Sequence, residues 1–297
     1  MNNKILSTKE LVDKILSNVI LDVQKLNHFN IFPKLDVVLV GNDFASFSYI
    51  KQKRKTCEKC NISFELHHLS EKINETEIIS LIEKLNNTKE TTGILIQLPL
   101  PSHLNTNNII KSILPQKDVD GFHFINAGKL FFNTDSLLPC TPYGIMQLFK
   151  FYNIEIKGKT IVIIGNSNIV GKPLALMCIN ENATVISCNK FTENLANYTI
   201  LADILVSATG KVNLINSNMI KDNVIIIDVG CCQFFDDNNK VYKIKGDVDF
   251  DDVINKVKYI TPVPGGVGPL TVAALMQNIV KACFLQYPDI FSTDFFS

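Results

Sequence analysis

The sequence has no net charge, no long basic run and no apolar N-terminal leader. Its 29 lysines and arginines balance its 29 aspartates and glutamates, so nucleic acid is a poor candidate as a partner. The first residues, MNNKILSTKE, lack the apolar core of a signal peptide. No apolar stretch reaches membrane-spanning length without a charge or a turn. We therefore expect a soluble, cytoplasmic protein that acts away from membranes.

The eight cysteines lack the spacing of a metal site or a disulfide framework. Cys57 and Cys60 form a C-x-x-C pair with no second pair, and the five histidines show no ligand spacing. Cys231 and Cys232 are adjacent, and several others lie in apolar runs. We expect no metal and interpret the cysteines as small, buried apolar side chains.

The 297 residues show two series of alternating strands and helices. The first series predicts strands at 35–40, 62–66 and 93–97 and helices at 8–28, 43–60, 75–87 and 104–113. The second predicts strands at 160–164, 183–188, 203–207 and 224–229 and helices at 171–181, 192–201 and 270–286. Between them, 115–141 is rich in Pro, Gly, Asp and Asn, which is typical of a connection. This alternation indicates an α/β protein with mostly parallel sheets and a Rossmann-like second half.

The strand at 160–164 runs into a turn from Gly165 to Gly171 and then into a helix. A helix N-terminus after such a turn offers free N–H groups and a positive dipole end to a pyrophosphate. The turn departs from the G-x-G-x-x-G form, so an ordinary strand–helix turn stays open as an alternative.

The following strand ends at Cys188-Asn-Lys190, without the acid that NAD sites use to hold the ribose hydroxyls. Lys190 would attract a 2′-phosphate, whereas a carboxylate would repel one. We therefore predict a preference for NADP over NAD, and a solvated surface lysine is the alternative for Lys190.

The helix at 43–60 places one lysine on its apolar face. At about 100° per residue, Lys53 falls between Tyr49 and Cys57, while the other lysines cover the opposite side. Tyr49 and Lys53 are neighbours at i and i+4. A half-buried lysine beside a tyrosine hydroxyl is a candidate proton-transfer group, and a lysine extending to solvent is the alternative.

Polar groups also stand at strand ends and in the connection. Gln97 ends a predicted strand, and Asp118 and Asp120 lie in the stretch that follows. A carboxylate can accept two N–H bonds from the amino-pyrimidine edge of a pterin. A turn-forming aspartate is the alternative for each, and only one of the two needs to be functional.

The segment Thr261–Thr271 holds three prolines and three glycines directly before an apolar helix. Proline stiffens the chain and glycine lets bare backbone approach a ligand closely. The segment is suited to face a ligand, and an elaborate helix-entry turn is the alternative.

Seven segments together resemble the bifunctional methylenetetrahydrofolate dehydrogenase/cyclohydrolase family. They occur in order over nearly the whole chain: 40–55, 97–101, 117–121, 139–142, 165–173, 246–248 and 261–271. The resemblance implies two α/β domains flanking a cleft. Residues 1–140 would form the folate-binding domain, to which 270–297 returns, and 141–269 the Rossmann-like NADP-binding domain. It also implies a homodimer joined through the cofactor domains.

The resemblance also implies roles for single residues. Lys53 matches the catalytic lysine, Tyr49 the residue that stacks on folate, Gln97 a group that assists Lys53, and Asp120 the pterin anchor. The remaining substrate-binding residues would be Leu98, Pro99, Pro264, Gly265, Gly266, Val267 and Gly268. The cofactor would meet Gly165, Asn166, Ser167, Lys190 and Cys231. Asn166 replaces an arginine that some relatives use for the 2′-phosphate, and Cys231 replaces a common isoleucine.

The implied activity has two steps: oxidation of 5,10-methylenetetrahydrofolate by NADP, then hydrolysis of the methenyl product to 10-formyltetrahydrofolate. Three alternatives stay open. They are a monofunctional dehydrogenase, a non-catalytic folate-binding protein, and another Rossmann oxidoreductase such as a shikimate-type dehydrogenase.

Overall fold

In the computed structural model, which describes residues 4–236 and 241–291, the chain divides into two compact units. Unit 1 holds the described residues up to Val12 together with Thr141–Thr271. Unit 2 holds Asp13–Cys140 together with the described residues from Val272 onward. The start of the chain, which the sequence analysis assigns to the first domain, thus lies in unit 1. The start of the chain pairs with β10 (Tyr259–Ile260) of unit 1. The N–H of Leu6 donates to the carbonyl of Ile260 at 2.8 Å, and Ile5 forms a parallel bridge with Ile260.

Unit 2 is built on a parallel sheet in the order β2-β1-β3. Its strands are β1 (Lys34–Val40), β2 (Ser63–Leu69) and β3 (Gly93–Ile96). Its helices are α1 (Lys9–His28), α2 (Phe44–Lys59), α3 (Glu75–Asn87), α4 (Thr106–Lys111), α5 (Phe124–Phe131) and α10 (Val267–Gln286). The first residues of α1 and of α10 belong to unit 1.

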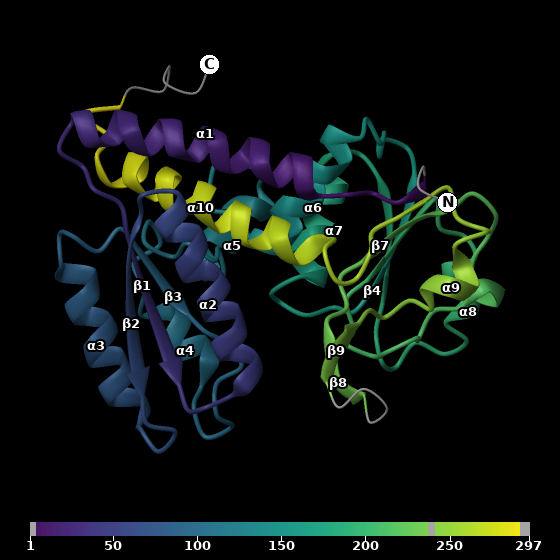
Figure 1. Ribbon diagram of the computed structural model, residues 1–297, viewed down its shortest axis with the longest axis horizontal. Coiled ribbons are helices and arrows are strands. Elements are labelled where there is room, and N and C mark those ends of the chain that lie inside the picture. Colours follow the sequence, from purple (N-terminus) through teal and green to yellow (C-terminus); the bar gives the residue numbers. More distant parts are fainter. Residues whose placement is uncertain (1–3, 237–240, 292–297) are drawn as a thin grey trace. The chain divides into compact units, whose positions relative to one another are not determined.

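Both faces of this sheet are covered, as the buried strands β1 and β3 require, whereas β2 at the sheet edge is only partly buried. On one face, Val38 and Ile94 belong to a buried cluster that α3 and α4 complete (Figure 1). Helices α2 and α10 also meet in the core of the unit, where the Cys57 thiol lies 3.7 Å from the Met276 sulfur. Helix α2, the carrier of Lys53, is therefore anchored to the core of the unit near its C-terminal end.

Unit 1 contains a five-stranded parallel sheet in the order β10-β7-β6-β4-β5. Its strands are β4 (Thr160–Ile164), β5 (Thr184–Cys188), β6 (Ile204–Ser207), β7 (Ile225–Asp228) and β10 (Tyr259–Ile260). Its helices are α6 (Cys140–Phe151), α7 (Gly171–Asn180), α8 (Ala196–Thr199) and α9 (Phe250–Val253). It also contains a short 3-10 helix, η2 (Ser217–Met219). The first residue of α6 belongs to unit 2. Numbered along the chain, the strand order is the doubly wound 2-1-3-4-5. The predicted α/β class with a Rossmann-like half is confirmed.

Several elements differ from the sequence-based prediction. No helix is predicted at α5 or α6, because prolines and glycines in and beside 115–141 indicate a connection. In the structure His123 caps α5 by accepting from the N–H of Ile125 at 3.1 Å. Pro142 falls in the first turn of α6, where its missing N–H costs little. The antiparallel pair β8 (Cys232–Asp236) and β9 (Val241–Lys245) is also unpredicted, and α8 is shorter than expected.

Helix α10 is long and apolar enough, by length and composition, to cross a membrane. However, 72% of its apolar window is buried inside the protein, as expected for a core helix of a folded domain.

Six of the eight cysteines are buried, in line with their interpretation as apolar side chains. Burial raises the pKa of the Cys57, Cys178 and Cys283 thiols to about 12. The interpretation is wrong for Cys231, which is exposed, and incomplete for Cys232, which is half-buried. Cys231 lies in the connection between β7 and β8, and Cys232 is the first residue of β8.

Candidate active site

The first candidate site lies in unit 2, at the carboxyl ends of β1 and β3. The order β2-β1-β3 makes this a point where chain connections diverge, and ligands of α/β sheets bind at such points. The Asp43 carboxylate caps α2 by accepting from the N–H of Ser46 at 2.8 Å and from its hydroxyl at 2.7 Å. This cap fixes the start of the helix that carries Tyr49 and Lys53.

Lys53 and Gln97 meet at this point. The Lys53 ammonium donates to Gln97 Oε1 at 3.0 Å. Gln97 directly follows β3 and is only 8% exposed, and its Nε2 donates to the carbonyl of Leu98 at 2.9 Å. Lys53 is half-buried, whereas Lys51 and Lys55 on the same helix are exposed. The face predicted for Lys53 is the one that the structure gives it.

Asp120 reaches the same place from a third segment. The backbone at Asp118 forms a parallel bridge with Ile94 of β3, so Asp120 lies at the carboxyl end of a neighbouring extended segment. Burial raises the pKa of the Asp120 carboxyl, and the positive charge of Lys53 and a hydrogen bond from the Cys140 thiol act in the opposite direction. A lysine, an amide and a carboxyl therefore converge on one sheet edge.

Asp118 has a different environment. It is 2% exposed and accepts from the N–H of His123 at 2.7 Å and from Asn126 Nδ2 at 2.9 Å. Burial raises its pKa to about 6. Because these partners tie Asp118 to α5, its role is to hold the fold, and Asp120 remains the candidate for substrate binding.

The other predicted substrate contacts of unit 2 surround this cluster in the sequence. Tyr49 is 37% exposed, one helical turn before Lys53. Leu98 is half-buried and Pro99 is exposed, directly after Gln97, and the peptide bond between them is cis. An exposed aromatic ring and an apolar turn beside the polar cluster suit a flat, partly apolar ligand.

The second candidate site lies in unit 1, between the carboxyl ends of β4 and β6, where its sheet also has a point of divergence. Gly165 adopts a φ of +103°, and a Cβ there would lie 2.3 Å from the carbonyl oxygen of Ala208. A Cβ on Gly171, the first residue of α7, would lie 1.8 Å from the Gly165 oxygen. The turn is thus as tight as backbone allows, and it leaves Asn166 and Ser167 exposed before α7. Bare N–H groups at a helix N-terminus fit a pyrophosphate.

The remaining residues that the resemblance assigns to the cofactor lie after β5 and β7, at this same edge of the sheet. Lys190 is exposed, and its ammonium lies 4.9 Å from the ring centroid of Phe191. The turn that carries it is held by Asn189, whose side-chain oxygen accepts from the N–H of Phe191 at 2.9 Å. Cys231 is exposed and follows Gly230 at the end of β7.

The proline- and glycine-rich segment Thr261–Thr271 is the last part of the chain in unit 1. Thr8 donates to the carbonyls of Gly265 and Gly266, both at 2.9 Å. A Cβ on Gly266 would lie 2.3 Å from the Pro262 oxygen, whereas Gly265 and Gly268 have open space. Pro264, Gly265 and Gly268 are exposed, and Gly266 and Val267 are buried. Gly266 and Val267 are therefore explained by packing, and the exposed residues Pro264, Gly265 and Gly268 remain candidates for ligand contact.

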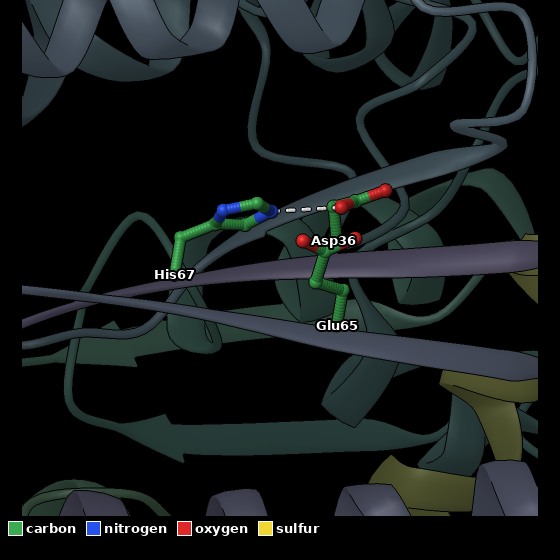
Figure 2. Close-up of side chains that lie close together, drawn as sticks. All are labelled: Asp36, Glu65 and His67. Atoms are coloured by element: carbon green, nitrogen blue, oxygen red, sulfur yellow. Dashed lines mark hydrogen bonds and ion pairs between the residues drawn. The ribbon is translucent and has the colours of Figure 1, made fainter.

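Two clusters of polar side chains in the structure are not predicted from the sequence. One joins Asp228 and Asp247, both buried, at the carboxyl ends of β6 and β7. The other lies on the sheet of unit 2, where Asp36, Glu65 and His67 come together (Figure 2). The second cluster arises from the pairing of β1 with β2, which places Asp36 opposite Glu65. No local pattern in the sequence signals this pairing.

The cluster in Figure 2 has its own positive charge. Lys34 places its ammonium 3.2 Å from Asp36 Oδ1 and 2.5 Å from Glu65 Oε2. Asp36 also contacts His67 Nε2 at 2.8 Å and accepts from the Thr91 hydroxyl at 3.0 Å. The carboxylates are therefore satisfied by a lysine, and we interpret the cluster as a structural ion-pair network.

Comparison with known proteins covers both units. Residues 6–120 match the tetrahydrofolate dehydrogenase/cyclohydrolase catalytic domain, and residues 139–287 match the NAD(P)-binding domain of the same family. The bifunctional protein FolD of Nautilia profundicola is 46% identical over 278 residues, which span 94% of this chain and 96% of that protein. FolD of Mycoplasma capricolum is 51% identical over 249 residues, 84% of this chain and 86% of its own length.

Solved structures give the same result. The bifunctional FolD enzyme of Campylobacter jejuni superposes with a TM-score of 0.90 at 46% identity, over 95% of this chain and 99% of that one. A Trypanosoma brucei dehydrogenase-cyclohydrolase, solved with NADP and an inhibitor, gives a TM-score of 0.91 at 30% identity, over 95% and 97% of the two chains. With both domain matches and this level of identity, the chain belongs to the tetrahydrofolate dehydrogenase/cyclohydrolase family.

Proposed function

We propose that this protein is a bifunctional enzyme of one-carbon metabolism. It oxidises 5,10-methylenetetrahydrofolate with NADP and hydrolyses the resulting 5,10-methenyltetrahydrofolate to 10-formyltetrahydrofolate. The observation that carries the proposal is the contact between Lys53 and Gln97 beside Asp120, in a chain that matches both domains of the family. Family membership removes the shikimate-type alternative.

In the first step the protein's contribution is binding and orientation. The exposed backbone around Gly165 to Ser167 suits the cofactor phosphates, and Cys231 would lie near the nicotinamide. NADP, when bound, accepts the hydride of the methylene carbon. In unit 2, the Asp120 carboxyl would accept the N–H groups of the pterin edge, and Tyr49 would stack on the ring.

In the second step water adds to the methenyl carbon, and a carbon–nitrogen bond of the bridging ring breaks. Lys53 is the group positioned to move the protons of this step, because Gln97 holds its ammonium at the sheet edge. Gln97 is itself oriented by its bond to the Leu98 carbonyl. Leu98 and Pro99, which directly follow Gln97, supply the apolar wall.

Two further features belong to this proposal. Lys190, at the end of β5, binds the 2′-phosphate of NADP, since no acid stands there to repel it. The protein acts in the cytoplasm as a homodimer joined through unit 1. A monomer mass by sedimentation at micromolar concentration contradicts the dimer.

The first experiment follows absorbance with methylenetetrahydrofolate and either NADP or NAD, and then with methenyltetrahydrofolate alone. We expect formation of NADPH and accelerated methenyl decay. NADPH without faster decay identifies a monofunctional dehydrogenase, and tight folate binding without either signal identifies a binding protein.

The decisive variant is Lys53→Met, which should lose methenyl hydrolysis while still binding NADP. Lys51→Met is the matched control, because Lys51 lies on the same helix but is exposed and away from Gln97. Full hydrolysis by Lys53→Met refutes the role of this lysine.

A further inference from the structure

Two buried aspartates join the loops at the cofactor edge of unit 1. The Asp247 carboxylate accepts from the hydroxyl of Ser207 at 2.8 Å, from the N–H and hydroxyl of Thr209 at 2.7 and 2.9 Å, and from the N–H of Lys211 at 3.0 Å. These donors form the end of β6 and the loop after it. Asp247 is 0% exposed.

Asp228, the last residue of β7, makes the corresponding contacts to the neighbouring loop. Its carboxylate accepts from the N–H groups of Gly230 at 2.9 Å, Asp247 at 3.0 Å and Val248 at 3.0 Å. Its own N–H donates to the Thr261 hydroxyl at 2.8 Å, so the start of the proline- and glycine-rich segment joins the network. Asp228 is 4% exposed.

Glycines let the two carboxylates press against the backbone. A Cβ on Gly230 would lie 2.2 Å from Asp247 Oδ1, and a Cβ on Gly246 would lie 1.9 Å from Asp228 Oδ2. The Asp247 carboxylate therefore lies directly beside the residue that precedes Cys231. Cys231 is the position that the proposed function gives to the nicotinamide side.

The pair is surrounded by neutral donors in the part of the chain whose side chains the structure describes, which leaves out those of 233–243. The hydrogen bonds that its two carboxylates accept there all come from hydroxyls or backbone amides. This contrasts with Asp36, where a lysine ammonium contacts the buried carboxylate. Neutral donors stabilise a carboxylate but leave its negative potential in place.

The oxidised nicotinamide ring carries a positive charge and the reduced ring carries none. Resting on the proposed function, we propose that Asp247, together with Asp228, is the specificity determinant that makes the cofactor site favour oxidised NADP over NADPH. A unit charge roughly 10 Å away, at an effective dielectric constant of about 20, changes a binding constant by about tenfold. The preference would load the oxidised cofactor and speed release of the reduced product.

The test measures dissociation constants of NADP and NADPH at pH 8 by titration calorimetry, for the wild type and for Asp247→Asn. At this pH Asp228 is ionised, since burial raises its pKa only to about 6. The ratio of the NADPH constant to the NADP constant should fall about tenfold in Asp247→Asn. A purely structural role weakens both forms in equal proportion, and an unchanged ratio overturns the proposal.

Two controls keep this test decisive. Ser207→Ala removes one donor to Asp247 but keeps the charge, so it should leave the ratio unchanged. The 2′-phosphorylated ADP-ribose lacks a nicotinamide ring, and its affinity should be similar in all variants that keep the fold. If Asp247→Asn does not fold, Asp228→Asn must lower the same ratio. Failure of the wild type to bind either cofactor contradicts the proposed function instead.

Discussion

Single residues at the unit 2 site are held by partners that leave little freedom. Gln97 uses both ends of its amide: Oε1 accepts from Lys53 at 3.0 Å, and Nε2 donates to the Leu98 carbonyl at 2.9 Å. Because a flipped amide would lose both bonds, the oxygen is fixed toward the lysine. The hydrogen-bond partner Gln97 is thus a neutral group, and it orients the Lys53 ammonium without forming an ion pair with it.

Lys190 allows a test of cofactor choice by one substitution. Lys190→Glu replaces an attractive charge at the end of β5 with one that repels a 2′-phosphate. We expect the KM for NADP to rise by about tenfold or more relative to the KM for NAD, which corresponds to about 1.4 kcal/mol. Initial rates with the two cofactors measure this ratio.

The control for Lys190 is Lys157→Glu, which makes the same charge change at an exposed position before β4, at the opposite end of the sheet. An equal change of the ratio in both variants indicates a general charge effect. An unchanged ratio in Lys190→Glu refutes the assignment of Lys190 to the 2′-phosphate.

At the scale of elements, the placement of Asp120 depends on how closely its segment approaches β3. Gly93 opens β3, and a Cβ there would lie 2.5 Å from a methyl carbon of Val119. Gly93→Ala should therefore push the segment of Asp120 away from the sheet, at a cost of about 1–3 kcal/mol in stability. We expect the KM for folate to rise and the KM for NADP to stay near its wild-type value.

The double variant Gly93→Ala with Val119→Ala tests this cause. It removes the colliding methyl groups, so folate KM should return toward the wild-type value even though Val119→Ala leaves a small cavity. Additive losses in the double variant contradict a steric origin. Urea unfolding of the four proteins provides the stability cycle.

Local patterns in the sequence predict the elements that have strong periodicity and miss those that depend on distant contacts. The α2 face pattern places Lys53 correctly, because helix periodicity alone decides which side is apolar. By contrast, α5 begins where His123 and Asp118 fix its first turn, and no periodic pattern in the sequence signals these contacts. Segment 246–248 contributes to the family resemblance, but the contacts of Asp247 cannot be predicted locally, since its partners Ser207 and Thr209 lie about 40 residues away in the sequence.

At the scale of the whole molecule, both units use the same structural device for different purposes. Each has a divergence point beside its first strand, and a glycine with positive φ leaves that strand: Gly41 at +80° and Gly165 at +103°. Unit 2 places side chains that can move protons at this point, and unit 1 places bare backbone. On the proposed function, parallel sheets with the same kind of divergence point thus support two tasks. The sheet of unit 2 carries the side chains for proton transfer, and the sheet of unit 1 carries the backbone that meets the cofactor phosphates.

Each unit also contains one buried aspartate whose pKa is raised to about 6, Asp118 in unit 2 and Asp228 in unit 1. A carboxyl whose folded pKa exceeds its unfolded value binds protons more tightly when folded. Its stabilising contribution is complete below the unfolded pKa, near 4, and is lost as pH rises through about 6. Asp118→Asn removes this titration while keeping an oxygen that can accept from the His123 N–H.

The unfolding free energy of Asp118→Asn relative to the wild type should therefore depend on pH. Between pH 4 and pH 7.5 the wild type should lose about 2 kcal/mol of its advantage over the variant. Urea unfolding at several pH values measures the difference. Asp222→Asn is the control, because it removes the charge of a carboxylate whose side chain is 80% exposed. An equal pH dependence in both variants would indicate a general effect of the lost charge. A constant difference in Asp118→Asn would mean that its bonds to His123 and Asn126 outweigh the cost of burial.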